Sequence, residues 1–310
     1  MPQEFKHIPV LPKEVIEALR PQSGKIYVDG TLGGGGHSLL ILQATDGQAK
    51  IIGIDQDPAA LQAAGQKLAH YKDKVTLVRS NFRNLGQVLN QLQIPKVDGI
   101  LLDLDVSTHQ LETPERGFSF SQSGEEQDAP LDMRMDPDSS LTAADIVNRC
   151  SQLELTQIFR QYGAEAQADK VAHRIIAARK SKPISTTDEL LAIIKSALPP
   201  KYRFSRTHHY ASPFFRAIRV KVNDEDGALK DVLPQGFDSL NPGGRMAVIS
   251  FHSFEDAIVK HTFQRMARTS GQDGKSMGIL ITKHSITATP EEVVANFKAR
   301  SGRLRVIEKC

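Results

Sequence analysis

A run of four glycines, residues 33–36, constrains the fold more than any other feature of this sequence. The residues before it, 25–29, include an apolar, β-branched stretch typical of a buried strand, and residues 38–45 open with a helical pattern. Between a strand and a helix, glycines let the backbone turn sharply and let its N–H groups approach a ligand closely. The run therefore predicts a ligand-binding turn in an α/β fold.

The next predicted strand, residues 50–55, ends in a carboxylate, Asp55, roughly 20 residues after the glycine run. At this distance a Rossmann-type fold binds the ribose of its cofactor with an acidic residue. The alternative interpretation of Asp55 is a cap at the end of the strand. Together, the glycines and the acid indicate a cofactor that contains a nucleoside.

Two common nucleotide-binding motifs fail in this sequence. The dinucleotide pattern G-x-G-x-x-G/A ends on Ser38 when it starts at Gly33 and on Leu39 when it starts at Gly34. The phosphate loop G-x-x-x-x-G-K-S fails because Thr269 stands in place of its first glycine. The sequence therefore disfavours NAD and offers no motif for ATP.

S-adenosylmethionine suits the order of the remaining features. Its amino acid end can bind at the glycine turn, its ribose hydroxyls can donate to Asp55, and its adenine can pack against Phe82. Phe82 follows the third predicted strand, residues 75–79, and the alternative interpretation of this side chain is packing in the core.

Composition sets the broad class of protein. The chain has 310 residues, of which 40% are hydrophobic, a net charge of +3 and two cysteines without paired spacing. It has no apolar run that approaches ~18–20 residues and no signal-peptide pattern at Met1. We therefore expect a globular cytoplasmic protein with no membrane segment, disulfide framework or metal site. Because the net charge is only mildly basic, nucleic-acid binding would depend on clustered cations.

The first hundred residues alternate between strand-like and helix-like runs, which predicts parallel βαβ winding. The strands are expected at 25–29, 50–55, 75–79 and 97–104, and the helices at 38–45, 58–70 and 84–93. After a helix at 226–240, a turn at 241–244 introduces the next buried strand, 245–251. One crossover needs far fewer residues than the interval between these last two strands, so a second module is inserted there.

Helix signals mark this inserted module. Ser151 with Glu154 and Thr186 with Glu189 match the capping-box pattern ahead of apolar-periodic runs, which predicts two or three short helices. After the strand 245–251, we expect a helix at 255–267 and strands at 278–282 and 304–307, which would complete a seven-stranded sheet.

Polar residues stand at the predicted carboxyl ends of the strands, where open α/β sheets bind ligands. They are Asp29, Asp55, Asp103 and His252. Asp103 is our candidate for the residue nearest the transferred methyl group, because a carboxylate can accept a proton from an exocyclic amine and align it. The alternative interpretation of Asp103 is a cap for the following loop.

Two basic runs indicate RNA binding. Residues 199–221 contain six Lys or Arg and no Asp or Glu, interleaved with aromatic residues, and residues 298–309 contain five Lys or Arg and one Glu. Cations with aromatic side chains between them suit phosphate contact and base stacking. Solvated charged faces are the alternative interpretation of each run.

With these residues in place, the chain resembles the bacterial 16S ribosomal RNA cytosine-N4 methyltransferase family, which uses S-adenosylmethionine to methylate a cytidine in the decoding region of the small subunit. The most specific matches are Arg116–Phe120, Leu131–Asp136 and Ser250–Ser253, and the resemblance covers essentially the whole chain. It implies a Rossmann-like class I methyltransferase domain, residues 1–111 and 216–310, with an inserted helical substrate-recognition domain, residues 112–215.

The resemblance also implies site residues. Cofactor contacts are expected at Gly35, Gly36, His37, Asp55, Phe82, Asp103 and Gln110. Candidates for RNA contact are Arg134, Arg203, Arg206, Arg216, Arg219, His252 and Arg300.

The chain departs from the family pattern at Asp105, His109, Pro213 and Ala257, all on the substrate side. Two alternatives to an active RNA methyltransferase therefore stay open. One is an RNA-binding or assembly protein that keeps the cofactor without turnover, and the other is a methyltransferase for DNA or a small molecule. The small ribosomal subunit is the expected partner, whereas the oligomeric state has no signal in the sequence.

Overall fold

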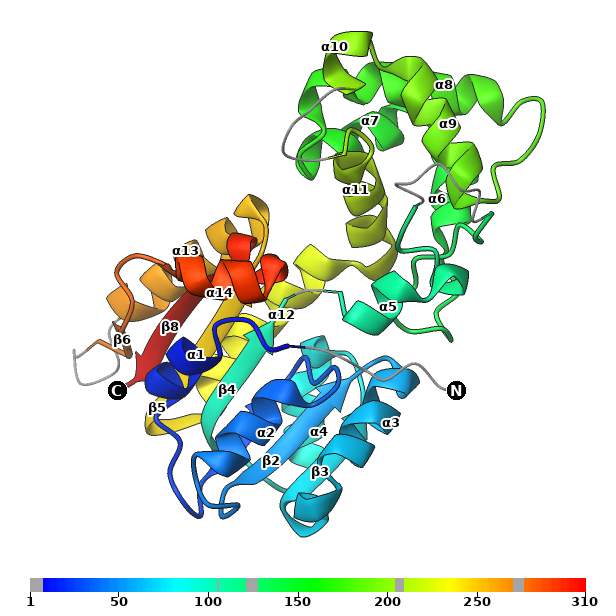
Figure 1. The fold of residues 1–310 in the computed structure, drawn as a ribbon. Helices are drawn as coiled ribbons and strands as arrows, with labels where there is room; N and C mark the ends of the chain where they lie inside the picture. Colours follow the sequence, from blue (N-terminus) through cyan, green and yellow to red (C-terminus); the bar gives the residue numbers. More distant parts are fainter. Residues whose placement is uncertain (1–7, 105, 121–127, 204–208, 270–275) are drawn as a thin grey trace. The chain divides into compact units, whose positions relative to one another are not determined.

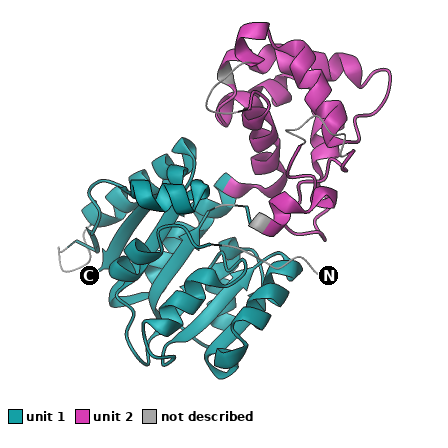
Figure 2. Ribbon diagram, viewed as in Figure 1, with its two compact units in different colours: residues 1–107, 226–310 teal, residues 108–225 magenta. Residues whose placement is uncertain are grey.

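The computed structural model describes residues 8–104, 106–120, 128–203, 209–269 and 276–310. The chain forms two compact units, residues 1–107 with 226–310, and residues 108–225 (Figure 2). The second unit extends ten residues beyond the expected boundary at 215 because α11 (Ser212–Asn223) is one continuous helix that packs on helices of that unit. Among the described residues, none of the helices combines the length and apolar character needed to span a membrane.

One sheet forms the centre of the first unit (Figure 1). Its strand order is β3-β2-β1-β4-β5-β8-β6, and β7 pairs with β8. Strands β1 to β5 are parallel, while β8 is antiparallel to both β5 and β6. The strands are β1 (Ile26–Asp29), β2 (Lys50–Asp55), β3 (Val75–Arg79), β4 (Val97–Asp103), β5 (Leu240–Ser250), β6 (Gly278–Leu280), β7 (Ile286–Thr287) and β8 (Arg303–Lys309).

This order, with one antiparallel strand near the edge, confirms the expected class I methyltransferase fold. The expected strand count was one too low, because β7 is only two residues long and carries no periodic pattern.

Helices cover both faces of the sheet. Because side chains alternate along a strand, Tyr27 and Ile51 enter the core on one face, and Val28 and Ile52 enter the core on the other. Fully burying an aliphatic or aromatic side chain contributes about 1.5–3 kcal/mol, so these two apolar layers hold the helices in place. The first face packs against α1 (Pro12–Leu19), α2 (Gly36–Gln43) and α3 (Pro58–Lys67), and the second against α4 (Leu85–Gln91), α12 (Glu225–Ser239) and α13 (Ser253–Arg268).

The predicted turn at 241–244 lies inside β5 and does not precede it, so the predicted start of this strand was wrong. Val97 of β4 aligns with Leu240, but Gly99 aligns with Arg245, and the intervening residues form an irregularity in the pairing. Gly243 lies there with φ of 78°, a conformation that suits glycine. Regular pairing begins at Arg245, where the sequence placed the strand.

Helices make up most of the second unit. The two predicted capping boxes are confirmed, because Ser151 caps α7 (Gln152–Gln161) together with Glu154, and Thr186 caps α9 (Thr187–Ala197) together with Glu189. The unit also contains helices that were not predicted, namely α5 (Thr108–Glu112), α6 (Ala143–Arg149), α8 (Ala168–Ala178) and α10 (Pro200–Arg203). Of these, α6 has a capping box of Thr142 and Asp145 that was missed in the sequence. The remaining elements are α14 (Pro290–Ala295) and the 3-10 helices η1 (Ala69–Lys74), η2 (Phe82–Asn84), η3 (Pro114–Arg116), η4 (Glu165–Gln167) and η5 (Phe297–Ser301).

Candidate active site

The backbone turns at the carboxyl end of β1 through glycines. The Gly30 N–H donates to Leu101 O at 2.9 Å, and a Cβ atom on Gly30 would lie 2.5 Å from Leu102 Cδ2. Gly33 and Gly35 have φ angles of 49° and 74°, a region that other residues enter at a cost of about 1–2 kcal/mol. Glycine is therefore needed at these positions, and the turn presents bare backbone at the end of the strand.

Helix α2 begins directly after this turn, with Gly35 as its N-cap and no side-chain cap. The N–H groups of its first turn have no partner inside the helix and carry the partial positive charge of the helix end. A Cβ atom on Gly36 would lie 2.7 Å from Pro9 Cγ, so the segment before α1 also approaches too closely for a side chain. A helix end of this kind suits the carboxylate of an amino acid.

Asp55 ends β2 and accepts two backbone hydrogen bonds. Its Oδ2 accepts from the Gly33 N–H at 2.8 Å, and its Oδ1 accepts from the Asp57 N–H at 2.9 Å. Burial raises the pKa of Asp55 to about 6, although both hydrogen bonds act to lower it. A carboxylate has about four acceptor positions, so each oxygen retains room for another donor such as a ribose hydroxyl. One carboxylate can therefore both cap the turn and bind a ribose.

Asp103 ends β4 beside a buried histidine of α2. Its Oδ2 lies 3.5 Å from His37 Nε2, and the two side chains are 9% and 6% exposed. Within the described part of the chain, neither ring nitrogen of His37 nor Oδ1 of Asp103 has a hydrogen-bond partner. Leaving buried polar atoms unpaired costs free energy. These atoms therefore mark a place where a polar ligand fits.

Two hydroxyl side chains near the glycine turn support Asp29 and Asp103, and neither was predicted from the sequence. The Ser38 hydroxyl donates to Asp29 Oδ2 at 2.7 Å, and Thr31 Oγ1 accepts the Asp103 N–H at 2.6 Å. Burial raises the pKa of Asp29, while the nearby His37 acts to lower it. The only sequence signal for these supports is the position of two hydroxyl residues on either side of the glycine run.

Phe82 begins η2 after β3 and is half-buried against the core on the α4 face. Its Cβ would lie 3.6 Å from a Cβ atom on Gly30, which places it beside the glycine turn. The preceding Asn81 donates through Nδ2 to Gln56 Oε1 at 2.9 Å and links the ends of β3 and β2. The side chain therefore packs in the core and also adjoins the turn, and its contact with an adenine stays a prediction.

The structure thus gathers most of the expected cofactor residues at the carboxyl edge of one sheet. These are Gly35, Gly36, His37, Asp55, Phe82 and Asp103. Gln110 belongs to the second unit, where it lies on α5 and is buried.

His252 lies at the same edge of the sheet as Asp103, because it follows β5, the neighbour of β4. Its ring stacks on Phe254 with 5.9 Å between the ring centroids. The buried Glu255 accepts the N–H groups of Phe251 and His252 at 2.8 and 3.0 Å. Sequence reasoning missed Glu255, although a Glu three residues after a helix N-cap is the signal of a capping box.

Two of the arginines expected to contact RNA are held by acids of the second unit. Arg134 donates to both carboxylate oxygens of Asp132 at 2.8 and 2.7 Å, and its Nη1 donates to two backbone carbonyls. Arg219 forms a two-point pair with Glu225 at 2.8 and 2.9 Å. These contacts brace the unit, so neither residue belongs to the proposed RNA-binding surface.

Two further arginines of the basic run 199–221 bind backbone carbonyls. Arg203 Nε donates to Leu198 O at 2.8 Å, and Arg216 Nη2 donates to Tyr162 O at 3.1 Å. Arg206 lies outside the described residues. The run is therefore not a row of free cations, because most of its described arginines are used to hold helices together.

The second basic run, residues 298–309, also contains both a paired arginine and an exposed one. Arg305 is buried and pairs with Asp256 at 2.7 and 3.0 Å. Arg300 is exposed and lies over the ring of Phe297, with 4.5 Å between its Cζ and the ring centroid. The Phe297 side chain is also exposed. Arg300 with Phe297 is therefore the part of this run that offers both a charge and an aromatic face.

Among the described residues, no three His, Cys, Asp or Glu side chains gather closely enough to hold a metal ion. The site instead offers bare glycine backbone, a free helix N-terminus, an acid with spare acceptor positions and orphaned buried polar atoms. These groups match the carboxylate, ribose and charged amine of S-adenosylmethionine, so the residues present fit that cofactor.

Comparison with known proteins finds relatives over nearly the whole chain. The chain is 47% identical to "Ribosomal RNA small subunit methyltransferase H" of Heliobacterium modesticaldum over 98% of this chain and 99% of that protein. It is 46% identical to the protein of the same name from Heliobacterium mobile, over 99% of each chain. A crystal structure of a putative rRNA-methylase from Clostridium thermocellum aligns over 98% of this chain and 100% of that one, with 12% identity and a TM-score of 0.43. The model of the MraW methylase family matches residues 4–310, and the chain therefore belongs to this family.

Proposed function

We propose that this protein transfers the methyl group of S-adenosylmethionine to the N4 amine of a cytidine in 16S ribosomal RNA. The observation that carries the proposal is the buried Asp103–His37 pair beside the glycine turn, in a chain of the MraW methylase family. The printed names of the Heliobacterium relatives support the RNA of the small ribosomal subunit as the substrate. The reaction belongs in the cytoplasm, where bacterial ribosomal subunits are present.

Residues at the carboxyl edge of the sheet would hold the cofactor. The first turn of α2 binds the carboxylate of its amino acid end, and Asp55 accepts hydrogen bonds from the ribose hydroxyls. Phe82 packs against the adenine. When bound, S-adenosylmethionine supplies an electrophilic methyl group on a positively charged sulfur.

Asp103 acts on the nucleophile. The N4 lone pair of cytosine is delocalised into the ring, so the amine is a weak nucleophile until a proton acceptor is positioned beside it. N4 would form a bond to the methyl carbon while the bond between that carbon and the sulfur breaks, which leaves S-adenosylhomocysteine as a neutral thioether. N4 would lose one proton in this step, and the Asp103 carboxylate would accept it. Oδ1 is the oxygen suited to this step, because it has no partner among the described residues, while Oδ2 adjoins His37. Positioned acid–base groups of this kind contribute typically 10²–10⁴-fold in rate.

RNA contacts are proposed on both units. Arg300 and Phe297 offer a phosphate contact with a stacking surface, and His252 lies at the same sheet edge as Asp103. We assign substrate recognition to the helical second unit, in which Gln110 is the expected cofactor contact and Arg203 and Arg216 remain candidates for RNA.

Methyl transfer to separate substrates tests the proposal. The purified protein is incubated with methyl-labelled S-adenosylmethionine and with small ribosomal subunits, naked 16S RNA, DNA or free nucleosides. We expect label in 16S RNA, as subunits or as naked RNA. Cofactor binding without any transfer would favour a non-catalytic RNA-binding protein, and transfer to DNA or to free nucleosides alone would favour a different methyltransferase.

A further inference from the structure

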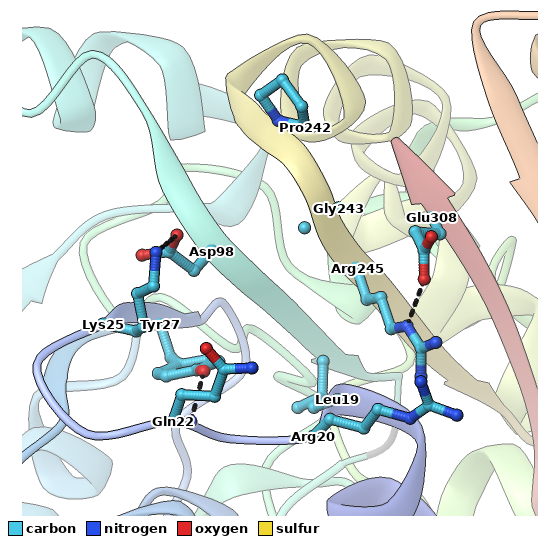
Figure 3. Close-up of a pocket in the computed structure, with 11 residues that line it drawn as sticks. Leu19, Arg20, Gln22, Lys25, Tyr27, Asp98, Pro242, Gly243, Arg245 and Glu308 are labelled. Atoms are coloured by element: carbon cyan, nitrogen blue, oxygen red, sulfur yellow. Dashed lines mark hydrogen bonds and ion pairs between the residues drawn. The ribbon is translucent and has the colours of Figure 1, made fainter. Parts of the chain in front are cut away.

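A pocket of about 270 Å³ opens at the opposite edge of the sheet from the candidate active site (Figure 3). It lies where β1 and β4 begin, next to the irregular part of β5 and the end of β8. All of its lining residues belong to the first unit. Because parallel strands separate the two edges, this pocket does not form part of the site for methyl transfer.

Charged groups line the pocket unevenly. Asp98 is neutralised on one side, since its Oδ1 lies 3.2 Å from Lys25 Nζ and its Oδ2 accepts the Ile26 N–H at 3.0 Å. On the other side, Arg245 is 6% exposed, and its Nε donates to Glu308 at 2.8 Å while Nη1 donates to the Ala18 carbonyl at 2.7 Å.

The remaining nitrogen of Arg245, Nη2, has no hydrogen-bond partner in the described part of the chain. Arg20 is exposed, and its guanidinium likewise has no ion pair or hydrogen bond with the described residues. In Figure 3 the guanidinium groups of Arg20 and Arg245 point toward each other. Glu308 pairs with Arg245 on the side away from Arg20, so the two guanidinium groups with this one carboxylate leave excess positive charge. An oxyanion placed between the two guanidinium groups would neutralise it.

The backbone around these arginines has an uncommon conformation. Arg20 ends α1 in the left-handed region, with φ of 48° and ψ of 60°, which costs a residue with a side chain about 1–2 kcal/mol. Gly243 also has a positive φ, and a Cβ atom there would meet nothing within 4 Å, so its backbone faces open space in the pocket wall. Arg20 and Gly243 both line the pocket.

We propose that this pocket is a second binding site, one for a phosphate group held between Arg20 and Arg245. Arg20 can bind a phosphate through two guanidinium nitrogens, and Arg245 can add a third donor, Nη2. The backbone at Gly243 and Gly244 borders the same space. The phosphate comes either from a small phosphorylated ligand or from the backbone of an RNA. The site does not depend on methyl transfer, so its test is separate from that of the proposed function.

Nuclear magnetic resonance on the full chain tests this site directly. Inorganic phosphate is titrated at constant ionic strength, set with sodium chloride, while the amide signals of Gly243 and Gly244 are followed. We expect saturable shifts of these signals in the wild-type protein. In Arg20→Gln, the dissociation constant rises about tenfold or more, because one charged hydrogen-bonding partner is lost. Arg20→Lys keeps the charge but not the planar fork, and we expect an intermediate value.

A matched control is Arg149→Gln, which removes the same charge from a side chain that is 81% exposed in the second unit and should leave the titration unchanged. A short oligoribonucleotide then identifies the source of the phosphate: displacement of inorganic phosphate assigns the site to RNA, and no displacement assigns it to a small ligand. The proposal is overturned if the glycine signals do not saturate with phosphate, or if wild type and Arg20→Gln titrate alike.

Discussion

The substitution Asp55→Asn tests the role of a partly buried carboxylate in the cofactor site. Asp55 accepts the N–H groups of Gly33 and Asp57 on separate oxygens. Asparagine has one acceptor oxygen in its side chain, so it cannot accept both N–H groups and still accept from a ribose. Loss of charged hydrogen bonds costs about 1.5–3 kcal/mol, which predicts cofactor binding about tenfold to a hundredfold weaker than wild type at pH 7.

Because the pKa of Asp55 is raised, both the free energy of unfolding and the cofactor affinity depend on pH. The pKa is 3.8 for an unperturbed aspartate and about 6 in the folded protein, so deprotonation costs about 3 kcal/mol more in the folded than in the unfolded chain. The folded protein therefore binds more protons between about pH 4 and 6, and its free energy of unfolding falls as the pH rises through that window. Ribose hydroxyls that donate to the carboxylate favour its ionised form. Cofactor affinity should consequently be about tenfold weaker at pH 5 than at pH 7.

Isothermal titration calorimetry with S-adenosylmethionine measures both effects. Repeating the titration at pH 6 in buffers of different ionisation enthalpy counts protons, and we expect the release of about half a proton from Asp55 on binding. Asp46→Asn is the control, because it removes the same charge from an exposed residue that already has a positive φ. The reasoning is refuted if wild-type affinity does not change between pH 5 and 7, or if Asp55→Asn releases as many protons as wild type.

Three other substitutions test separate parts of the structure. Asp103→Asn should lower kcat for methyl transfer by about a hundredfold or more without changing the melting temperature, since the backbone bond to Thr31 Oγ1 remains. Gly30→Ala should lower the free energy of unfolding in urea by about 1–3 kcal/mol, because its Cβ would lie 2.5 Å from a Leu102 methyl carbon. Arg305→Gln should cost up to about 3–5 kcal/mol in the same assay, since it removes the two-point partner of the buried Asp256 carboxylate and leaves only the longer contact with Arg303 Nη1 at 3.7 Å.

Each of these three predictions has a control variant or a result that would contradict it. Undiminished turnover of Asp103→Asn would remove this residue from the mechanism. Gly65→Ala is the control for Gly30→Ala, because its Cβ would make an ordinary contact of 3.5 Å within α3, where alanine stabilises a helix by up to about 1 kcal/mol. If Gly30→Ala were as stable as Gly65→Ala, the packing argument would be wrong. Arg149→Gln is the exposed control for Arg305→Gln.

Most of the sheet could be predicted because its signals are local. Strands such as β2 and β4 are short apolar runs that end in a carboxylate, and their order along the chain determines βαβ winding. The errors arose where tertiary pairing overrides the local signal. Residues 241–244 read as a turn, yet pairing with β4 continues across them, and β7 exists only because β8 offers it an edge.

In the candidate site, too, the features with local sequence signals could be predicted, whereas those that depend on tertiary contacts could not. Motif reasoning selected the glycines, Asp55 and Asp103, because their chemistry follows from their position at strand ends. It could not select the partners of the arginines, since Arg305 meets Asp256 only through the folded sheet. The second basic run therefore looked free in the sequence although part of it is buried and paired. The contact between His37 and Asp103 was equally hidden, because α2 and β4 are far apart in the chain.

The identity of the methylated nucleoside tests the proposed methyl transfer to cytidine N4 most directly. Small ribosomal subunits or naked 16S RNA that lack the modification are incubated with the protein and S-adenosylmethionine that carries a deuterated methyl group. The RNA is then digested to nucleosides for mass spectrometry. We predict that the deuterated methyl group appears in N4-methylcytidine and that Asp103→Asn gives none. Label on carbon 5 of cytosine, on another base or on no nucleoside would contradict the account.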